Sequence, residues 1–500
     1  MRTRWTAGLA AGAVAGLVYL RTLAPTITWR NSGADSGDLA TAAFTLGIPH
    51  PPGYPLYTLL AAAFAHLPFG EPARNVGLFS ALAATGAVVM FYRAIMVLLS
   101  AGGRTGWQHE IIAASITLTL AFSPLFWSQA TIAEVYALEA LLVAALLTTL
   151  LSDIGPRLEI AAALFGLGFA HHYSIALLVP TALLLLSDSR LTRQRIMSAS
   201  LLFLAPLFLY AYLPIRAATD PPVNWGDPRT PDRLWWVLTA EPYRPYLLGL
   251  SSGDIVERMA TTARFLFEQF NIWGVVLGLW GVAGMMVGES RRARRQALAL
   301  LTGLGFYIVY AILYGTRDSY IYLIPGFMLF ALLIAFGIDE IAQRLSAGWP
   351  RVALAGALVL LPFYNLAANF QSMDLSRDRQ GFDYAAQVFR EVPEDAVVFA
   401  KGDERVFALW YYRFVIAGSS SRVVVVSPEL LQFDWYYDEI KGRLDLEASG
   451  SRYDVRVKEI VDQSLRHRRT VYSTTRDAPF QKYVMESQGE LYRIWSPPNE

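Results

Sequence analysis

The 500-residue chain contains no cysteine, which excludes disulfide bonds and thiolate metal sites. Charged residues are scarce, at 17% of the chain, whereas hydrophobic residues make up 54%. The formal net charge is only +1, so the composition gives no indication of a nucleic-acid partner. Lysine is absent before residue 401, and the four lysines, Lys401, Lys441, Lys458 and Lys482, all lie in the last fifth. This shift in composition predicts a second domain.

Long apolar runs recur between residues 6 and 368 and indicate an α-helical polytopic membrane protein. A hydrocarbon core about 30 Å thick needs about 20 apolar residues per helix, so these runs predict about eleven transmembrane helices. We place them near residues 6–24, 75–99, 110–127, 133–151, 157–170, 173–187, 196–213, 264–287, 296–314, 320–342 and 350–367. Segment 55–67 is too short to span and is expected to be an interfacial or re-entrant helix.

The placement of arginine orients the predicted helices. Clusters at 190–195 and 291–295 fall on the same side as Arg2, Arg4, Arg93, Arg104, Arg344 and Arg351. Because cytoplasmic loops are enriched in arginine and lysine, this side is expected to be cytoplasmic. The N-terminus is then cytoplasmic and the C-terminal domain extracytoplasmic, in a cell inner (plasma) membrane.

The predicted boundary separates a transmembrane domain at 1–368 from a soluble tail at 369–500. In the tail, residues 380–391 suit an amphipathic helix, while 396–400 and 422–427 suit buried strands with a helix between them. This alternation predicts a small α/β unit with a parallel sheet. Its first strand is not followed by a glycine-rich nucleotide motif, so we interpret the tail as a docking or acceptor-recognition domain.

The first outer loop, residues 25–74, holds two carboxylates and a histidine. Asp35 and Asp38 are spaced to share a helix face. Paired carboxylates can divide labour, because one accepts a proton while the other binds a cation or holds geometry. A helix N-cap is the alternative for each. His50 precedes a rigid proline-glycine turn, which would hold the acidic loop against the bundle.

Further ionisable residues fall on the same outer face, where charges at a membrane edge are costly and usually functional. Glu134 opens a predicted helix, a position that the helix dipole favours for a carboxylate. His171 and His172 lie at the outer end of a short hairpin and suggest a metal site or a phosphate contact. A divalent metal would need about three or four ligands, which the acidic residues could complete. No cofactor is otherwise indicated.

Two arginines, Arg216 and Arg317, stand at the outer edges of predicted helices, and guanidinium forks bind phosphate through two bonds. A phosphate at a membrane edge belongs to a lipid headgroup or a polyprenyl carrier. The alternatives are a snorkelling side chain or an ion pair of Arg317 with Asp318. Loop 214–262 carries aromatic residues that can stack on sugars or mark the membrane interface. The substrate-site candidates are His50, Glu134, Trp225, Asp227 and Asp318.

Several of these stretches resemble one family. They are GADSGDL at 33–39, HPPGYPLY at 50–57, AEVYAL at 133–138, HHYS at 171–174, NWGDP at 224–228 and RDSYIYLIP at 317–325. The pattern resembles the domain-of-unknown-function family 2723 over roughly residues 15–330. The resemblance implies a GT-C type membrane glycosyltransferase, in a group that includes a eukaryotic endoplasmic-reticulum protein O-mannosyltransferase. It also implies a polyprenyl-phosphate sugar donor and chemistry on the exoplasmic face.

The family motif places the catalytic acidic loop at Asp35 and Asp38. The second acidic position in the family is more often glutamate, so the resemblance makes Asp35 the expected base. The tail differs among relatives, and the acceptor does not carry over.

The sequence therefore predicts an inverting membrane glycosyltransferase that moves a sugar, with mannose as the candidate, to a hydroxyl of a protein or glycan. The catalytic pair is Asp35 and Asp38, with Asp35 as general base. The donor phosphate is expected to meet His171, His172, Arg216 and Arg317. The alternative is a transporter or flippase of lipid-linked sugars. Transporters place charges near the bilayer midplane, often in repeated halves, and this chain shows no internal repeat.

Overall fold

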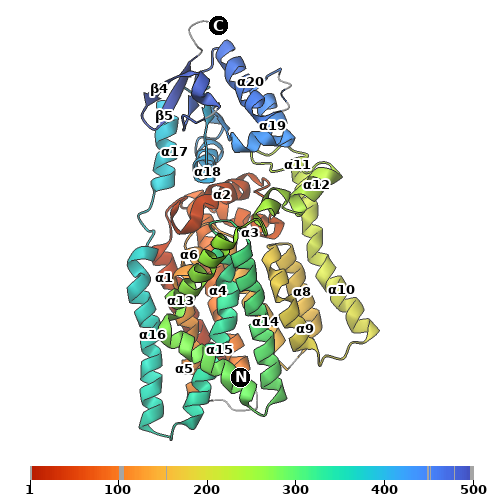
Figure 1. The fold of residues 1–500 in the computed structure, drawn as a ribbon, viewed down its shortest axis with the longest axis vertical. Helices are drawn as coiled ribbons and strands as arrows, with labels where there is room; N and C mark the ends of the chain where they lie inside the picture. Colours follow the sequence, from red (N-terminus) through yellow and green to blue (C-terminus); the bar gives the residue numbers. More distant parts are fainter. Residues whose placement is uncertain are drawn as a thin grey trace.

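The computed structural model describes residues 3–100, 106–153, 155–447, 450, 452–477 and 479–495, with side chains from residue 5 onward. A bundle of long helices carries a smaller α/β domain at one end, which contains the C-terminal part of the chain (Figure 1). Residues 1–2 of the predicted membrane domain and residues 496–500 of the predicted tail domain lie outside the described residues.

The bundle consists of helices joined mostly by short connections. They are α1 (Thr3–Thr22), α4 (Pro72–Leu99), α5 (Trp107–Ala121), α6 (Pro124–Ala130), α7 (Tyr136–Leu151), α8 (Arg157–Phe169), α9 (Val179–Leu186), α10 (Arg193–Leu207), α11 (Tyr212–Ala217), α13 (Ser252–Val287), α14 (Arg291–Leu313), α15 (Leu323–Arg344) and α16 (Trp349–Met373). The exceptions are the long segments between α1 and α4 and between α11 and α13. Local chemistry fixes several starts: α4 begins at Pro72 with the Glu71 side chain accepting from the Arg74 N–H, and α13 begins with a capping box at Ser251.

All eleven segments predicted to cross a membrane are mainly helical. In the part of the chain that the structure describes, six helices are long and apolar enough to span, and the α5–α6 pair, bent by 71°, would make a seventh. Helices such as α7 are shorter apolar segments. The predicted count of eleven therefore stays a prediction. The predicted boundary at 368 falls inside α16, which continues to Met373.

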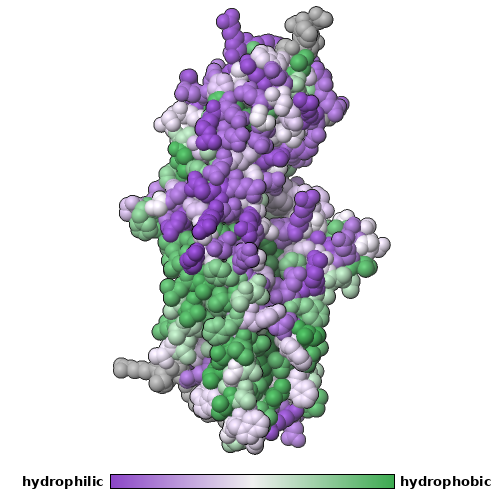
Figure 2. All heavy atoms as spheres, turned by 90° about the vertical axis from the view of Figure 1, so that its left-hand side faces the viewer, coloured by the Kyte–Doolittle hydropathy of each residue, from purple (hydrophilic) through white to green (hydrophobic). Residues whose placement is uncertain are grey.

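The surface of the bundle differs from that of the tail. Figure 2 shows a broad hydrophobic band over the helices and a largely hydrophilic surface over the α/β domain. Large apolar side chains on the outer helices are exposed, including Phe208, Trp273, Leu360 and Phe363. Such a contiguous apolar surface marks a face that meets lipid.

Small residues let the first helices approach closely. A Cβ on Gly8 would lie 2.6 Å from the Tyr92 ring, and a Cβ on Gly12 would lie 2.5 Å from the Val89 side chain. This spacing of four along α1 is the small-residue packing that membrane helices use. It fixes α1 against α4 and so places the loop that follows α1.

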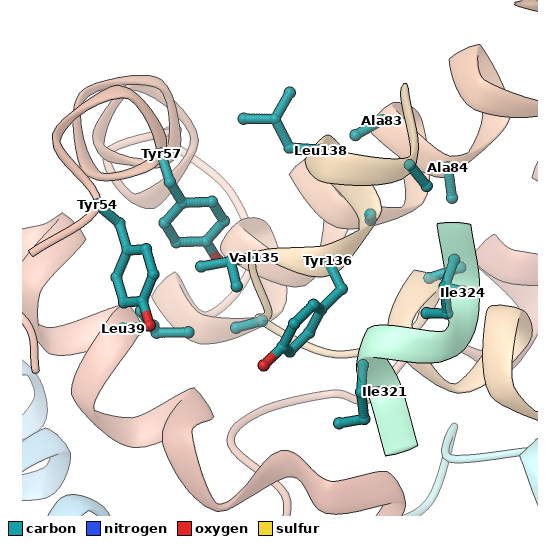
Figure 3. Packing of buried hydrophobic residues seen from close by; sticks show 14 of the residues in the cluster. Leu39, Tyr54, Tyr57, Ala83, Ala84, Val135, Tyr136, Leu138, Ile321 and Ile324 are labelled. Carbon is teal, nitrogen blue, oxygen red and sulfur yellow. The ribbon is translucent and has the colours of Figure 1, made fainter. Parts of the chain in front are cut away.

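That loop contains the polar motifs. It passes through the short helix η1 (Arg30–Asp35) into α2 (Ser36–Thr45) and then, through the proline-glycine turn, into α3 (Pro55–Ala65). Near this loop, the buried rings of Tyr54, Tyr57 and Tyr136 gather with Leu39 and Val135 (Figure 3).

The tail begins with α17 (Gln380–Glu391), as predicted, and forms a five-stranded sheet of order β2-β1-β3-β5-β4. Its strands are β1 (Val397–Phe399), β2 (Val424–Val426), β3 (Val471–Ser473), β4 (Val484–Gln488) and β5 (Leu491–Trp495). The first three are parallel, as expected, whereas β5 pairs antiparallel with both β3 and β4. The other helices are α18 (Asp403–Tyr411), α19 (Asp434–Leu444) and α20 (Tyr453–Arg466).

Helix α18 docks the tail onto α2 (Figure 1). A Cβ on Gly37 would lie only 2.5 Å from the Phe407 carbonyl oxygen, so the two backbones are in close contact. The Trp29 indole donates to the Glu404 carbonyl at 2.8 Å, and the Tyr411 hydroxyl bonds to Glu71 on the bundle side. The tail therefore lies directly over the acidic loop.

Candidate active site

Asp38 is fully buried and both of its oxygens are bonded. Oδ2 accepts from the backbone N–H of His50 at 2.9 Å and lies 2.8 Å from His50 Nδ1. Oδ1 accepts from the Trp225 indole at 3.1 Å. A carboxylate committed in this way has no face left for a substrate, so Asp38 holds His50 and Trp225 in place.

Asp35 has the opposite environment. Its side chain keeps 32% of its surface exposed, and its Oδ2 lies 3.9 Å from His50 Nε2. The partial burial of the carboxyl group raises the pKa of Asp35 to about 7, the charge of His50 opposes this rise, and the carboxylates of Asp318 and Asp403 add to it. A carboxylate with this pKa accepts a proton readily near neutral pH.

His50 links the two carboxylates. Burial lowers its pKa, but Asp35 and the hydrogen bond to Asp38 outweigh that effect and raise the pKa to about 9. The ring is therefore charged at neutral pH. Its Nε2 also lies 3.1 Å from the Tyr54 hydroxyl. The imidazolium supplies a positive charge beside Asp35.

The local chain explains this geometry. Asn31 and Ser32 adopt left-handed backbone angles, with φ of 59° and 60°, and turn the chain so that Asp35 precedes the first residue of α2. Asp38 then falls in the first turn of α2 and points inward. Ile48, just before His50, makes backbone bonds to Val223 and Trp225, which brings the NWGDP turn against the loop.

Further carboxylates surround Asp35. Glu134 is buried just before α7, and burial followed by the charge of Asp35 raises its pKa well above the usual range. Asp318 influences both groups electrostatically. Asp403, the first residue of α18, comes from the tail, and burial raises its pKa to about 6. The site is thus strongly acidic, with His50 as its neighbouring cation.

The histidine pair lies on the inner side of this cluster. His172 stacks on Tyr54 with ring centroids 5.8 Å apart, and its Nδ1 lies 2.7 Å from the Ser174 hydroxyl. His171 Nε2 lies 2.9 Å from the Val135 carbonyl oxygen. Burial lowers the pKa of His171 to about 4 and that of His172 to about 3. Both rings are therefore neutral at pH 7 and contribute no positive charge.

The two predicted arginines have different surroundings. Arg216 donates to the carbonyls of Leu46 and Thr45 at 2.6 Å and 3.3 Å, so it caps the C-terminal end of α2. Arg317 is exposed and makes no hydrogen bond or ion pair within the described residues. It borders a cavity of about 170 Å³, together with Asn31, Ser32, Pro124, Leu125, Ser128, Gln129, Phe265, Asp318, Tyr320 and Ile321.

The remaining candidates occupy the NWGDP turn. Trp225 points toward Asp38, whereas Asp227 is ion-paired with Arg229 at 2.6 Å and with Arg233. Asp227 also accepts from the Asn224 amide at 3.2 Å, so it stabilises the turn rather than joining the cluster around Asp35.

Three residues near Asp35 and His50 were not among the site residues predicted from the sequence: Tyr54, Tyr243 and Asp403. Tyr54 lies inside the HPPGYPLY stretch, and Tyr243 approaches His50 edge-on at 6.5 Å. Asp403 directly follows Gly402 beyond the first strand of the tail, at the edge of a parallel sheet where ligands bind. Within the described residues, no group of three or more metal-ligating side chains is arranged to hold a metal ion.

The helical bundle, the acidic loop that follows α1 and the α/β domain over it define a class: a multi-pass membrane protein with the GT-C fold. Two solved structures share this fold over 97% of both chains, each with a TM-score of 0.58. They are ArnT from Cupriavidus metallidurans in the apo state and bound to undecaprenyl phosphate, at 12% and 13% sequence identity. The predicted fold class is confirmed.

Sequence relatives agree with this class. Residues 35–195 match the family described as the Protein O-mannosyl-transferase TMEM260 N-terminal domain, and residues 381–484 match TMEM260-associated domain 2. Protein O-mannosyl-transferase TMEM260 of Mus musculus is 27% identical over 481 residues, covering 88% of this chain and 66% of the relative. The Dictyostelium discoideum protein of the same name is 21% identical, covering 84% and 57%.

The chain thus spans 66% of the length of the mouse relative and 57% of the length of the Dictyostelium relative. The matches relate it to GT-C-type proteins of the O-mannosyltransferase kind, and the resemblance predicted from the sequence is confirmed.

Proposed function

We propose that the protein is a membrane glycosyltransferase that moves a sugar from a polyprenyl-phosphate donor to a hydroxyl group. The observation that carries the proposal is the pairing of an accessible Asp35 with the charged His50, beneath the tail. The names of the mouse and Dictyostelium relatives support mannose as the sugar and a protein as the acceptor. Undecaprenyl phosphate in one ArnT structure supports a polyprenyl carrier.

In this proposal the reaction is a single displacement that inverts the anomeric carbon. The acceptor hydroxyl gives its proton to the Asp35 carboxylate as its oxygen attacks the anomeric carbon. The bond between that carbon and the phosphate oxygen breaks, and polyprenyl phosphate leaves. Asp35 acts as general base, and its raised pKa matches this task at neutral pH.

Asp38 and His50 position the base. Asp38 anchors the His50 ring and the Trp225 indole, and the imidazolium keeps enough positive charge beside Asp35 to favour its ionised form. Asp38 is therefore a positioning residue rather than a second base. This division of labour supports the assignment of Asp35 as the base.

The donor phosphate is proposed to bind near Arg317. This guanidinium is free of partners in the described chain and borders a cavity that combines polar Asn31 and Gln129 with apolar Phe265 and Ile321. A phosphate joined to an isoprenoid needs both kinds of surface. The neutral His171 and His172 can offer only hydrogen bonds, and Arg216 is engaged at the end of α2. Arg317 is thus the main candidate for stabilising the leaving group.

The site faces the extracytoplasmic side in this proposal, in agreement with the arginine distribution.

The proposal is tested with purified protein, polyprenyl-phosphate mannose and a serine-containing protein acceptor. We expect mannose on the acceptor, detected by mass spectrometry. Arg317→Lys keeps the charge but loses the two-point fork, so it should weaken donor affinity by about tenfold with little change in acceptor KM. Lipid-linked sugar that crosses vesicle membranes without any transfer product would instead identify a flippase and overturn the proposal.

A further inference from the structure

A second cavity, of about 500 Å³, lies between the NWGDP turn and the tail domain. Segment 220–233 forms one wall and α19 forms the other. The lining residues are Asp220, Pro221, Asn224, Asp227, Arg229, Arg233, Trp435, Asp438, Glu439, Gly442 and Arg443. None of these residues takes part in the proposed reaction. We call this space the rear cleft.

The rear cleft adjoins the active site through one turn of the chain. Asn224 lines the cleft, while the next residue, Trp225, donates to Asp38. The same turn pairs with Ile48 through backbone bonds. A ligand in the cleft would therefore contact the opposite side of the turn that holds the catalytic loop.

Two polar atoms of the cleft walls lack a partner within the described residues. They are the acceptor Asn224 Oδ1 and the donor Trp435 Nε1, and each of the two residues is only 7% exposed. Leaving such atoms unpaired costs about 1–3 kcal/mol each. A ligand in the cleft that carries both a donor and an acceptor would offer them partners.

The charges of the cleft are nearly balanced. Four carboxylates face three guanidinium groups, and most are paired across or along the walls. Arg233, for example, pairs with Asp227 and lies 3.6 Å from Asp438. Arg443 bonds to the Pro222 carbonyl at 2.7 Å. This balance does not suit a phosphorylated or otherwise strongly anionic ligand.

The packing of Trp435 distinguishes a peptide from a sugar. Its ring lies against Trp225 at 5.8 Å, Trp236 at 6.1 Å and Phe433 at 6.4 Å. Because other rings cover it, it offers no free face on which a sugar could stack. A polypeptide backbone, by contrast, presents a donor and an acceptor in every residue.

We propose that the rear cleft binds an extended segment of the acceptor polypeptide, next to the residue that receives the sugar. The inference rests on the proposed transferase function and adds a site for acceptor recognition. Because the walls come from the membrane domain and the tail, the tail takes part directly in choosing acceptors.

The absence of cysteine allows a direct test. Gly442 lies on the cleft wall, and a Cβ added there has no atom within 4 Å, so Gly442→Cys introduces a single thiol without a clash. A bulky fluorescein maleimide on this thiol would fill the cleft. Gly106→Cys is the matched control, since its added Cβ also lies in open space, at the start of α5 and outside the rear cleft.

Transfer is measured to an unstructured serine-containing peptide and to N-acetyl-serine methylamide, before and after labelling. We expect labelling of the Gly442→Cys protein to raise the peptide KM by at least about tenfold, with unchanged transfer to the small acceptor. The Gly106→Cys control should change neither value. Peptide should also slow labelling of the Gly442→Cys thiol.

Complete labelling with an unchanged peptide KM would overturn the inference, and a defect confined to an oligosaccharide acceptor would overturn the peptide assignment. If the unmodified protein transfers sugar to neither acceptor, the proposed function fails. Protection of the introduced thiol by the peptide would still decide whether the cleft binds polypeptide.

Discussion

Asp35 and Asp38 are three residues apart, yet they have different chemical environments. Asp38 is fully buried and saturated by His50 and Trp225, whereas Asp35 keeps an exposed surface next to a cation. A base must reach its substrate, and a positioning carboxylate must not move. The exposed Asp35 meets the first requirement and the buried Asp38 meets the second, so the two carboxylates cannot exchange roles.

The first prediction at this scale concerns pH. Asp35 works only when deprotonated, and its pKa is about 7, so kcat/KM should rise with pH up to about 7 and then level off. At pH 5 the rate should be about 100-fold below the plateau, since one pH unit changes the ionised fraction about tenfold. A profile that is flat from pH 5 to 8 would contradict this assignment.

His50→Gln provides the control for that profile. The positive charge of His50 lowers the pKa of Asp35, so its removal should move the rising limb to higher pH. A variant that only lowers the plateau, with the limb unmoved, would show that His50 acts through structure alone.

At the scale of secondary-structure elements, the contact of α2 with α18 joins the membrane domain to the tail. Gly37 permits this approach, because an added Cβ would lie 2.5 Å from the carbonyl oxygen and 2.6 Å from the carbonyl carbon of Phe407. Backbone atoms in a helix cannot rotate away. The helices would have to separate, and Asp403 at the start of α18 would withdraw from the site.

Gly37→Val is therefore expected to destabilise the docked state by about 1–3 kcal/mol, as overpacking generally does. The connection between α16 and α17, residues 374–379, should then be cut faster by protease, and transfer should fall. Gly356→Val is the matched control, because its side chain would point into open space on α16, away from the rear cleft and from the contact of α2 with α18. Equal protease resistance of Gly37→Val and the original protein would contradict the docking role.

The sequence predicted those elements whose pattern is local. The period of the apolar residues located α17 at 380–391 and the buried strands at β1 and β2. The strand β4 escaped prediction because it is a largely exposed edge strand, and its pairing with β5 depends on contacts along the sheet. The break between α5 and α6 also escaped, although Pro124 marks it.

Across the whole molecule, the hydrophobic band in Figure 2 separates the tail from the opposite end of the bundle. The basic residues at 190–195 and 291–295 flank α10 and α14 at the end away from the tail (Figure 1). Arginine-rich loops stay in the cytoplasm, so we expect the tail to be extracytoplasmic. A phosphatase reporter fused to the C-terminus should be active, and a reporter active only in the cytoplasm would contradict this orientation.

The arrangement of the two domains explains which residues of the site could be predicted from the sequence. Asp35, Asp38 and His50 lie within one loop, so their spacing was informative. Asp403 could not be assigned, because only the docking of the tail on α2 brings it toward His50. Arg216 looked like a phosphate ligand by its position, whereas its donor groups are turned toward the carbonyls at the end of α2.

The central claim is that Asp35 is the base in sugar transfer, and single-turnover transfer from bound polyprenyl-phosphate mannose tests it most directly. Asp35→Asn keeps the shape of the side chain but removes the base, so transfer should slow by about 10²–10⁴ while donor affinity stays the same. Asp38→Asn is the comparison, and it should slow transfer less. Near-normal transfer by Asp35→Asn, with the donor fully bound, would contradict the account.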